Sequence, residues 1–286
     1  MIENKNIIVT GASSGIGKSI MDELVAQEGN RILAACRHAE AIQGYGDNVI
    51  PFSCDLSTQA GVDALFAKAE ELFDKVDVFF CNAGAPYYER FDYEDWNRIQ
   101  RIFDLNTVGH IYTYSKYLHH LNGREGRLVY TISAMGEMAL PGYALYAATK
   151  FAMKGFQQAI RDETPENLKI SCVYPVSTKT NFFKVGGGGI KMESPFPVQA
   201  PEKVGKAVVK GHRQAQGAHL SLPGLPAEQD PDERRPARQE ALHQGPAGQA
   251  APLRQARRGG KGRHPGRHQA QEDFEIRRKA IHGKHP

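Results

Sequence analysis

A glycine-rich turn near the start of the chain constrains the fold more than any other feature. Residues 10–17 read Thr-Gly-Ala-Ser-Ser-Gly-Ile-Gly, directly after the apolar run Asn6–Val9 and directly before a helical pattern. Gly11 permits a tight turn, Gly15 lets the backbone approach a pyrophosphate, and Gly17 lets the helix pack closely on a sheet. Free amides and the dipole at the helix start attract phosphate. In this context the glycines predict a dinucleotide cradle, whereas alone they would also fit an ordinary strand–helix turn.

Further apolar runs alternate with helical patterns as far as residue 211. The other expected strands are Arg31–Cys36, Val49–Ser53, Val76–Cys81, Arg127–Ile132 and Lys169–Tyr174. The first expected helix follows the glycine turn and ends at about Glu28. The others are Thr58–Asp74, Tyr93–Asp104, Val108–Leu121, Tyr143–Asp162 and Pro201–Gly211. Repeated strand–helix–strand units with continuously apolar strands predict an α/β fold, a Rossmann-type doubly wound parallel sheet in a single domain over residues 1–211.

Cysteine use and hydropathy exclude several classes of protein. The four cysteines stand alone, without the spacing of a metal site, so we expect reduced core thiols and no metal. No apolar run approaches the ~20 residues of a membrane span, and no signal peptide precedes the first strand. The sequence therefore predicts a cytoplasmic protein without a membrane partner.

Six motifs in a fixed order make the chain resemble the short-chain dehydrogenase/reductase family. They are TGxxxGxG at residues 10–17, Asp55-Leu56, Asn82-Ala83-Gly84, Asn106, Ser133 with Tyr146-x-x-x-Lys150, and Pro175, and the resemblance covers about Lys5 to Gly211. It implies a nicotinamide-dependent oxidoreductase that interconverts a ketone or aldehyde and an alcohol. It also implies a small-molecule substrate and a homodimer or homotetramer.

The resemblance implies a cofactor that follows the glycine turn and the ends of several strands. The implied cofactor-binding residues are Gly11, Ser13, Ser14, Gly15, Ile16, Gly17, Arg37, Asp55, Leu56, Asn82, Ala83, Gly84, Tyr146, Lys150, Pro175 and Thr180. Asp55 and Leu56 would flank the adenine. Pro175 and Thr180 would meet the nicotinamide carboxamide, although Val176 stands where the family usually has glycine.

The end of the second expected strand bears on the choice of cofactor. A carboxylate there would accept hydrogen bonds from the ribose 2′-hydroxyl of NAD. Ala35 takes that place, and the guanidinium of Arg37 is suited to a 2′-phosphate. NADP(H) is therefore expected over NAD(H). A solvated loop position for Arg37 is the alternative, because Cys36 fills the family's commonest basic position.

Tyr146 and Lys150 lie four residues apart in an expected helix, so their side chains share one face. A carbonyl reductase must protonate the oxygen as hydride reaches the carbon, and a phenol can do so, although its usual pKa is near 10. A nearby ammonium and an oxidised nicotinamide favour phenolate, and a pKa lowered by ~3 units needs roughly 4 kcal/mol. Beside the glycine cradle, the pair predicts a catalytic acid/base rather than a surface contact.

Two further catalytic residues complete the expected set. Ser133 follows a strand at the carboxyl end of the sheet, 13 residues before Tyr146, where its hydroxyl would hold the substrate oxygen. The resemblance implies that the main chain of Asn106 binds a water that links Lys150 to solvent. A simple helix cap is the alternative, and both roles can hold together. None of the eleven histidines is needed.

The substrate is not legible in the sequence. Six residues are candidates either for an apolar pocket or for the core: Tyr87, Tyr88, Phe91, Met138, Leu140 and Tyr143. Gly186–Gly189 would allow residues 181–199 to hinge as a lid, or the loop has no gating role.

The composition changes after residue 211. Residues 212–286 hold 14 Lys and Arg against 8 Asp and Glu, one Phe, and no Val, Tyr, Trp, Met or Cys. Such a stretch cannot bury enough apolar surface to offset its ordering entropy, so we expect a disordered, low-complexity basic tail. Read one base later, its first codons allow the run that similar enzymes carry here, so frameshifted translation is a second interpretation.

Three functions from different classes fit these features. The first is the NADP(H)-dependent reductase, and the second is a catalytically silent NAD(P)-binding sensor of the same fold, which the full set of catalytic residues disfavours. The third is nucleic-acid binding through the tail. That tail lacks the stacking aromatics of single-strand binders, so no nucleic-acid partner is expected.

Overall fold

The computed structural model describes residues 2–92, 94–180, 198–211 and 219–221. Residues 219–221 are described by their backbone alone. The expected hinge Gly186–Gly189 and nearly all of the expected tail lie outside the described residues.

The described strands form a seven-stranded sheet in the order β3-β2-β1-β4-β5-β6-β7. They are β1 (Asn6–Thr10), β2 (Arg31–Cys36), β3 (Val49–Ser53), β4 (Val78–Cys81), β5 (Gly126–Thr131), β6 (Leu168–Tyr174) and β7 (His219–Ser221). Every pair of neighbours is parallel, which confirms the expected doubly wound sheet. The strand order reverses beside β1, and ligands of such folds bind at the carboxyl ends of the strands at that point.

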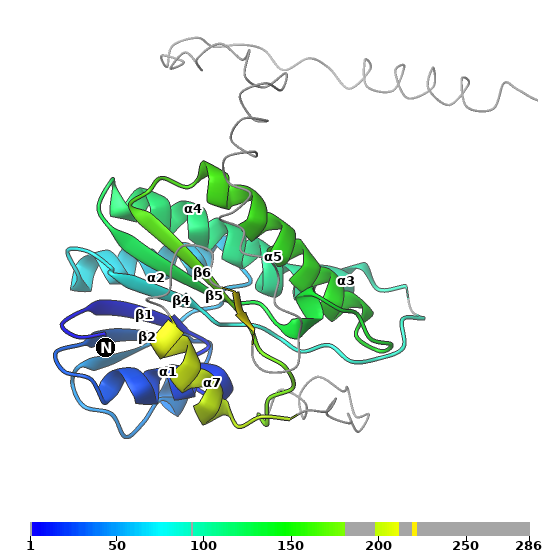
Figure 1. Cartoon of the computed structure of the whole chain (residues 1–286), viewed down its shortest axis with the longest axis horizontal. Coiled ribbons are helices and arrows are strands. Elements are labelled where there is room, and N and C mark those ends of the chain that lie inside the picture. The colour runs from blue at the N-terminus through cyan, green and yellow to red at the C-terminus, as the bar shows by residue number, and fades with distance from the viewer. Residues whose placement is uncertain (1, 93, 181–197, 212–218, 222–286) are drawn as a thin grey trace, which may run out of the picture. The chain divides into compact units, whose positions relative to one another are not determined.

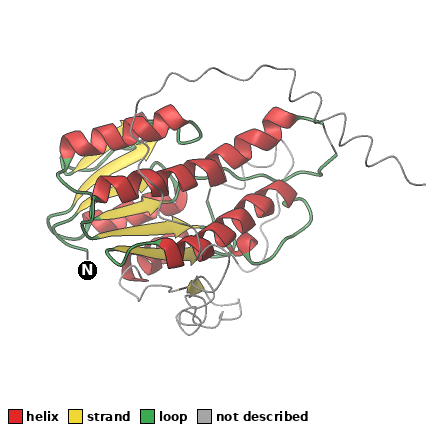
Figure 2. Cartoon of the chain, turned by 90° about the horizontal axis from the view of Figure 1, so that it is seen from above, coloured by secondary structure: helices red, strands yellow, loops and turns green. Residues whose placement is uncertain are grey.

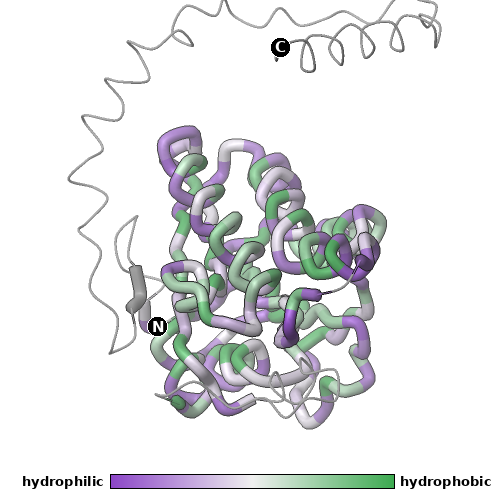
Figure 3. Tube along the Cα trace, turned by 90° about the vertical axis from the view of Figure 1, so that its right-hand side faces the viewer, coloured by the Kyte–Doolittle hydropathy of each residue, from purple (hydrophilic) through white to green (hydrophobic). Residues whose placement is uncertain are grey.

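Helices cover both faces of the sheet (Figures 1 and 2). They are α1 (Gly15–Val25), α2 (Gln59–Leu72), α3 (Trp96–Phe103), α4 (Gly109–Leu121), α5 (Ala144–Glu163) and α7 (Pro201–Gly211). Helices α1 and α7 pack on one face of the sheet, whereas α2, α4 and α5 pack on the other. Along the helices, hydrophobic and hydrophilic residues alternate, as expected where one side of each helix is buried (Figure 3).

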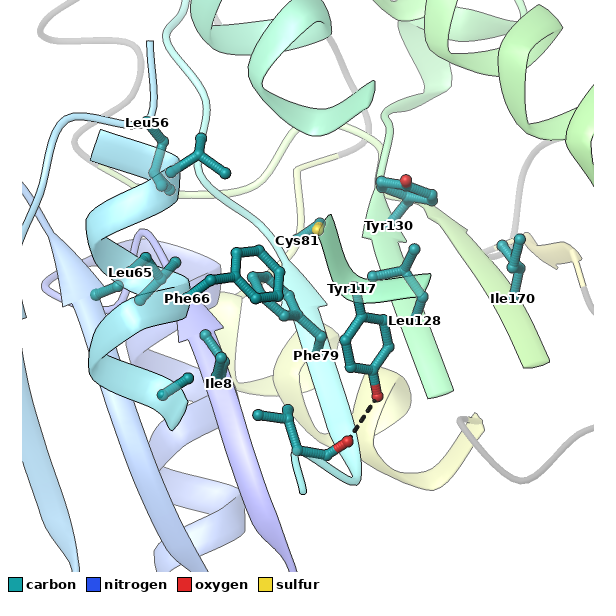
Figure 4. Close-up of a cluster of buried hydrophobic side chains, with 14 of the residues drawn as sticks. Ile8, Leu56, Leu65, Phe66, Phe79, Cys81, Tyr117, Leu128, Tyr130 and Ile170 are labelled. Carbon is teal, nitrogen blue, oxygen red and sulfur yellow. Dashed lines mark hydrogen bonds between the residues drawn. The ribbon is translucent and has the colours of Figure 1, made fainter. Parts of the chain in front are cut away.

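Successive residues of a strand serve opposite faces of the sheet. Ile7 and Val9 pack in the core under α1 and α7, and Ile8 between them packs in the core under α2, α4 and α5. The second core is rich in aromatic rings, with Phe66 stacked on Phe79 (Figure 4). Where both faces of a strand are buried, as in β4 and in β2 after Arg31, every residue is apolar.

The chain runs from α3 into α4 without a break, where the sequence predicts two separate helices. A π-helical segment, Asp104–Val108, joins them and widens the helix by one residue. Asn106 lies in the middle of this segment, so the interpretation of Asn106 as a helix cap is wrong.

Strand β7 is an addition to the expected elements. It lies within the segment expected to be a tail and pairs with β6 through Cys172–Tyr174. Without β7, the edge of β6 would present unpaired backbone groups, and backbone pairing with that edge requires no apolar side chains.

In the described part of the chain, no helix has the length and apolar character needed to cross a membrane. All four cysteines, which lie within it, are buried and unpaired.

Candidate active site

A cavity of about 690 Å³ opens at the carboxyl ends of the strands. Most of the residues that the sequence predicts for cofactor and catalysis line it together: Gly11, Ser13, Ser14, Gly15, Ile16, Arg37, Asp55, Leu56, Asn82, Ala83, Gly84, Ser133, Tyr146, Lys150, Pro175 and Thr180. Gly17 and Asn106 are not among the lining residues, and both lie directly behind them. The cavity therefore joins seven segments that are separate in the sequence.

The glycine turn has the backbone that the sequence requires. Gly11 and Gly15 have φ angles of 66° and 56°, in the left-handed region that favours glycine. A Cβ on Gly17 would lie 2.2 Å from the carbonyl oxygen of Gly11. No side chain fits at Gly17, so the start of α1 can lie against the end of β1.

The start of α1 fits a dinucleotide phosphate. Ser14 is the N-cap of α1, and within the described chain its side chain makes no capping hydrogen bond. The first amides of a helix lack partners inside the helix, and they carry the positive end of its dipole. Together with Ser13 and Gly15, which line the cavity, they form a site suited to a pyrophosphate.

Thr10 braces the ends of β1 and β4, a role that the sequence did not reveal. Its hydroxyl accepts hydrogen bonds from the backbone N–H groups of Asn82 (2.9 Å) and Ala83 (3.1 Å) and donates to the carbonyl of Phe80 (3.1 Å). The Asn82 side chain donates in turn to the Thr10 carbonyl (3.2 Å). These contacts fix the Asn82-Ala83-Gly84 turn opposite the glycine cradle.

At the end of β2, the residue that faces the cavity is one position later in the chain than the sequence predicts. Ala35 is fully buried in the core, whereas Cys36 lines the cavity beside Arg37. The neutral residue at the strand end is therefore Cys36. Despite partial burial, the pKa of Asp55 lies below its usual value, because Ser57 donates two hydrogen bonds to it and Arg37 is nearby.

Tyr146, Ser133 and Lys150 meet at one end of the cavity. The Ser133 hydroxyl hydrogen-bonds the Tyr146 phenol, and the Lys150 ammonium lies 5.5 Å from the centre of the Tyr146 ring. Lys150 also donates to the carbonyl of Thr131 at 3.4 Å. A proton donor, a second hydroxyl and a cation thus converge, which is a suitable set for protonating a carbonyl oxygen.

Burial governs the protonation of this set in the chain by itself. It raises the pKa of Tyr146 to about 12, against the lowering effect of the Ser133 hydrogen bond. It also lowers the pKa of Lys150 to about 8. The expected lowering of the Tyr146 pKa involves a bound oxidised nicotinamide as well as Lys150 and stays a prediction, whereas desolvation dominates in the chain by itself. Tyr146 holds its proton at neutral pH.

Ser133 has a strained backbone. Its φ and ψ angles are 149° and 155°, a region populated almost only by glycine. The strain turns the residue after β5, and the Ser133 hydroxyl also accepts a hydrogen bond from the N–H of Met135 (3.1 Å). A non-glycine residue there indicates that the hydroxyl is needed at this position.

Asn106 contacts the site through its side chain. The amide oxygen accepts from the N–H of Ala85 (2.8 Å), and the amide nitrogen donates to the Ala85 carbonyl (2.9 Å). The same nitrogen lies 3.3 Å from the hydroxyl of Thr149, which donates to the carbonyl of Tyr146 (2.7 Å). Asn106 therefore ties the Ala85 loop to α5, the helix that carries Tyr146 and Lys150.

Comparison with known proteins agrees with this geometry. The family model described as short chain dehydrogenase matches residues 5–186. The chain belongs to the short-chain dehydrogenase/reductase family. It is thus an oxidoreductase that acts on CH–OH and C=O groups with a nicotinamide cofactor.

One curated relative and two solved structures illustrate the similarity, the structures for the fold alone. The 3-ketodihydrosphingosine reductase of Bos taurus is 29% identical over 224 residues, which are 72% of this chain and 67% of the relative. The 3-ketoacyl-(acyl-carrier-protein) reductase of Brucella melitensis, solved with NADH, superposes with a TM-score of 0.68 at 21% identity and covers 78% of this chain and 98% of its own. A Burkholderia cenocepacia short chain dehydrogenase, solved with NADP, has a TM-score of 0.66 at 21% identity, covering 84% and 96%.

His110 is a buried residue of this dehydrogenase/reductase that the sequence did not single out. Its Nε2 lies 2.8 Å from the carbonyl oxygen of Ala83, so this nitrogen carries the proton and donates. Burial, and then the charge of Lys150, lower the pKa of His110 to about 4. His110 follows Asn106 by four residues in a helical stretch, and this spacing was the available signal. The neutral imidazole holds the cofactor-side turn from behind.

Only half of the expected substrate-pocket residues line the cavity. Met138, Leu140 and Tyr143 do, whereas Tyr87 and Tyr88 pack against a small cluster that includes Tyr143 and Tyr146. Phe91 is half exposed and also lies outside the lining. Among the lining residues, Met135 joins the three that the sequence predicted.

Proposed function

We propose that the chain is an NADP(H)-dependent reductase that interconverts a ketone or aldehyde and the corresponding alcohol. The observation that carries the proposal is the convergence of Ser133, Tyr146 and Lys150 in the cavity that also contains the glycine cradle. The glycine cradle, the Asn82-Ala83-Gly84 turn and the catalytic set line one cavity, as a reaction between a dinucleotide and a small molecule requires.

The chain's own residues account for the proton chemistry. A nicotinamide dinucleotide held by the glycine cradle and the Asn82-Ala83-Gly84 turn would supply or accept the hydride. In the reductive direction the Tyr146 phenol, protonated because of its burial, gives its proton to the substrate oxygen. The Ser133 hydroxyl holds that oxygen beside Tyr146, and the Lys150 ammonium stabilises the phenolate left behind. A proton from solvent then restores Tyr146.

The cavity favours a phosphorylated adenosine. Cys36 presents no carboxylate to accept hydrogen bonds from a ribose 2′-hydroxyl, and Arg37 lines the same end of the cavity. An exposed guanidinium pairs well with a phosphate dianion. Solved relatives contain either NADP or NADH, which supports a nicotinamide cofactor without selecting one of them.

The decisive experiment is turnover by the Tyr146→Phe variant. The wild-type protein is first screened with NADPH and NADH against ketones and aldehydes, including 3-ketodihydrosphingosine because of the bovine relative. The variant keeps the ring but loses the proton donor, so turnover is expected to fall ~10²–10⁴-fold while cofactor binding persists. Unchanged turnover would refute the role of Tyr146. Cofactor binding without turnover of any carbonyl by the wild type would favour the silent sensor.

A further inference from the structure

Tyr143 carries a buried polar atom that its own fold does not use. The residue is 5% exposed and lines the cavity, and its hydroxyl has no hydrogen-bond partner within the described chain. Leaving a buried hydroxyl unpaired costs free energy, and phenylalanine would pack equally well without that cost. A tyrosine here indicates a partner beyond the described residues, and because Tyr143 lines the cavity a bound ligand is suited to that role.

The ring of Tyr143 is held in place by its neighbours. Its centre lies 4.9 Å from that of the Tyr88 ring, with the planes inclined at 58°. Gly142 has a φ angle of 84°, and a Cβ there would lie 2.5 Å from the Tyr88 ring. The Gly142 carbonyl accepts a hydrogen bond from the N–H of Glu89 (2.9 Å). The Tyr143 hydroxyl is therefore presented in a defined position, as recognition of a ligand requires.

Tyr143 lies close to the reacting position. It is the N-cap of α5, three residues before Tyr146, and residues three apart at a helix start share one face. The two phenols are near enough for Tyr143 to raise the pKa of Tyr146. A group that Tyr143 binds therefore belongs to the part of the substrate next to the reacting carbonyl.

The surroundings of Tyr143 restrict that group to an uncharged one. Met135, Met138 and Leu140 line this end of the cavity. The charged side chains among the described lining residues are Lys150 and, at the ends of β2 and β3, Arg37 and Asp55. Two strands separate β2 from β5, which leads to the Tyr143 end. Lys150 is the charged lining residue on the Tyr146 side, and in the proposed mechanism its charge serves the phenolate of Tyr146. A charged substrate group beside Tyr143 would therefore have no counter-ion of its own among the described lining residues.

We propose that Tyr143 is a specificity-determining residue whose hydroxyl hydrogen-bonds a second, uncharged oxygen next to the reacting carbonyl. The substrate class is then a hydroxy ketone or diketone on an otherwise apolar frame. This inference rests on the proposed carbonyl reductase function and names the substrates of that same site.

The test compares matched ketones with and without the second oxygen. Acetoin is paired with butanone, and benzoin with deoxybenzoin, with NADPH as the reductant. For Tyr143→Phe, kcat/KM is expected to fall roughly tenfold to a hundredfold on acetoin and benzoin and to stay unchanged on butanone and deoxybenzoin. Loss of a buried unpaired hydroxyl is expected to leave the melting temperature unchanged or higher.

Tyr114→Phe is the matched control. The Tyr114 hydroxyl lies 2.9 Å from that of Thr164, and Tyr114 is not among the lining residues. This variant is expected to lower the melting temperature and to leave both members of each pair unaffected. Tyr143→Phe is expected to lower kcat/KM on acetoin and benzoin without lowering the melting temperature, whereas Tyr114→Phe is expected to do the reverse. The comparison therefore separates a role in recognition from a role in stability.

The other outcomes would overturn either the role of Tyr143 or the proposed reductase function. Equal losses on both members of a pair, or no loss on either, would overturn the role of Tyr143 in recognising a second oxygen. No turnover of any carbonyl by the wild type would overturn the proposed function instead. In that case thermal shifts by acetoin and benzoin in the presence of NADPH, measured for wild type and Tyr143→Phe, still test recognition. A shift that the variant retains in full would overturn it.

Discussion

The ammonium nitrogen of Lys150 lies 5.5 Å from the centre of the Tyr146 ring, and both side chains are more than nine-tenths buried. Burial disfavours the charged form of each group. It therefore moves the two pKa values in opposite directions, to about 8 for Lys150 and about 12 for Tyr146. Below pH 8 the site holds a cation and a protonated phenol, the combination needed to reduce a carbonyl.

This pair predicts the pH dependence of reduction. As pH rises through about 8, Lys150 loses the charge that stabilises the phenolate, while Tyr146 is still protonated. We expect kcat for carbonyl reduction to be level at neutral pH and to decline above pH 8. The measurement is kcat at saturating NADPH from pH 6 to pH 10. A rate that stays level up to pH 10 would contradict the assignment of the decline to Lys150.

His110 predicts a loss of stability in acid. Its pKa is about 4 in the folded chain, whereas an unfolded histidine titrates near 6.5. Between these values the unfolded chain binds more protons, so the free energy of unfolding falls as pH drops from about 6.5 to 4, by at most roughly 3 kcal/mol. His110→Gln is expected to reduce this loss, because an amide can donate to Ala83 without titrating. Denaturant unfolding at pH 7 and pH 4.5 measures the change.

The control for His110 is His119→Gln, an exposed residue of the same helix. It is expected to leave the acid dependence of the wild type in place. If His110→Gln and His119→Gln behave alike, the acid loss arises elsewhere in the chain.

How far the sequence predicts this protein depends on which physical rule is used. Strands such as β2 and β4 could be assigned because both of their faces are buried and each reads as an apolar run. The same property leaves no sequence signal for which residues of a strand point to which face of the sheet. In Arg31–Cys36 every position after the first is apolar and buried, so the sequence could not decide whether Ala35 or Cys36 faces the cavity.

The protonation of the site was beyond the sequence for a related reason. Spacing places Tyr146 and Lys150 on one helix face, and the attraction between them was the effect that could be foreseen. Desolvation depends on how deeply α5 packs, which only the fold determines. The side-chain contacts of Asn106 with Ala85, 21 residues apart, likewise depend on a π-helical segment for which the sequence has no periodic signal.

Ser133 predicts an unusual order of stability among small substitutions. Its φ of 149° suits glycine, so Ser133→Gly relieves backbone strain that Ser133→Ala retains. Both variants lose the hydroxyl and are expected to lose activity. The glycine variant is nevertheless expected to be more stable than the alanine variant by about 1 kcal/mol, after allowance for glycine's greater freedom when unfolded. Urea unfolding compares them, and a more stable alanine variant would argue against strain at this position.

Two glycines on helices predict opposite effects of the same substitution. In Gly17→Ala the new Cβ would lie 2.2 Å from the Gly11 carbonyl, so the turn must move. We expect a loss of roughly 1–3 kcal/mol in unfolding free energy and weaker NADPH binding, read from nucleotide fluorescence. Gly155 in α5 has open space around its Cα, so Gly155→Ala is expected to stabilise by about 0.5–1 kcal/mol with binding unchanged. Equal NADPH affinity in both variants would contradict the close approach at Gly17.

Cys36 predicts where the cofactor preference can be reversed. Cys36→Asp places a carboxylate at the strand end that lines the cavity, where it would accept hydrogen bonds from a ribose 2′-hydroxyl and repel a 2′-phosphate. We expect kcat/KM to fall for NADPH and rise for NADH, reversing a preference of the wild type for NADPH. Arg37→Ala is expected to weaken NADPH alone. In Ala35→Asp the carboxylate would instead be buried in the core, so this variant is expected to unfold rather than change preference. A folded Ala35→Asp variant with NADH preference, and an inert Cys36→Asp variant, would show that Ala35 faces the cofactor after all.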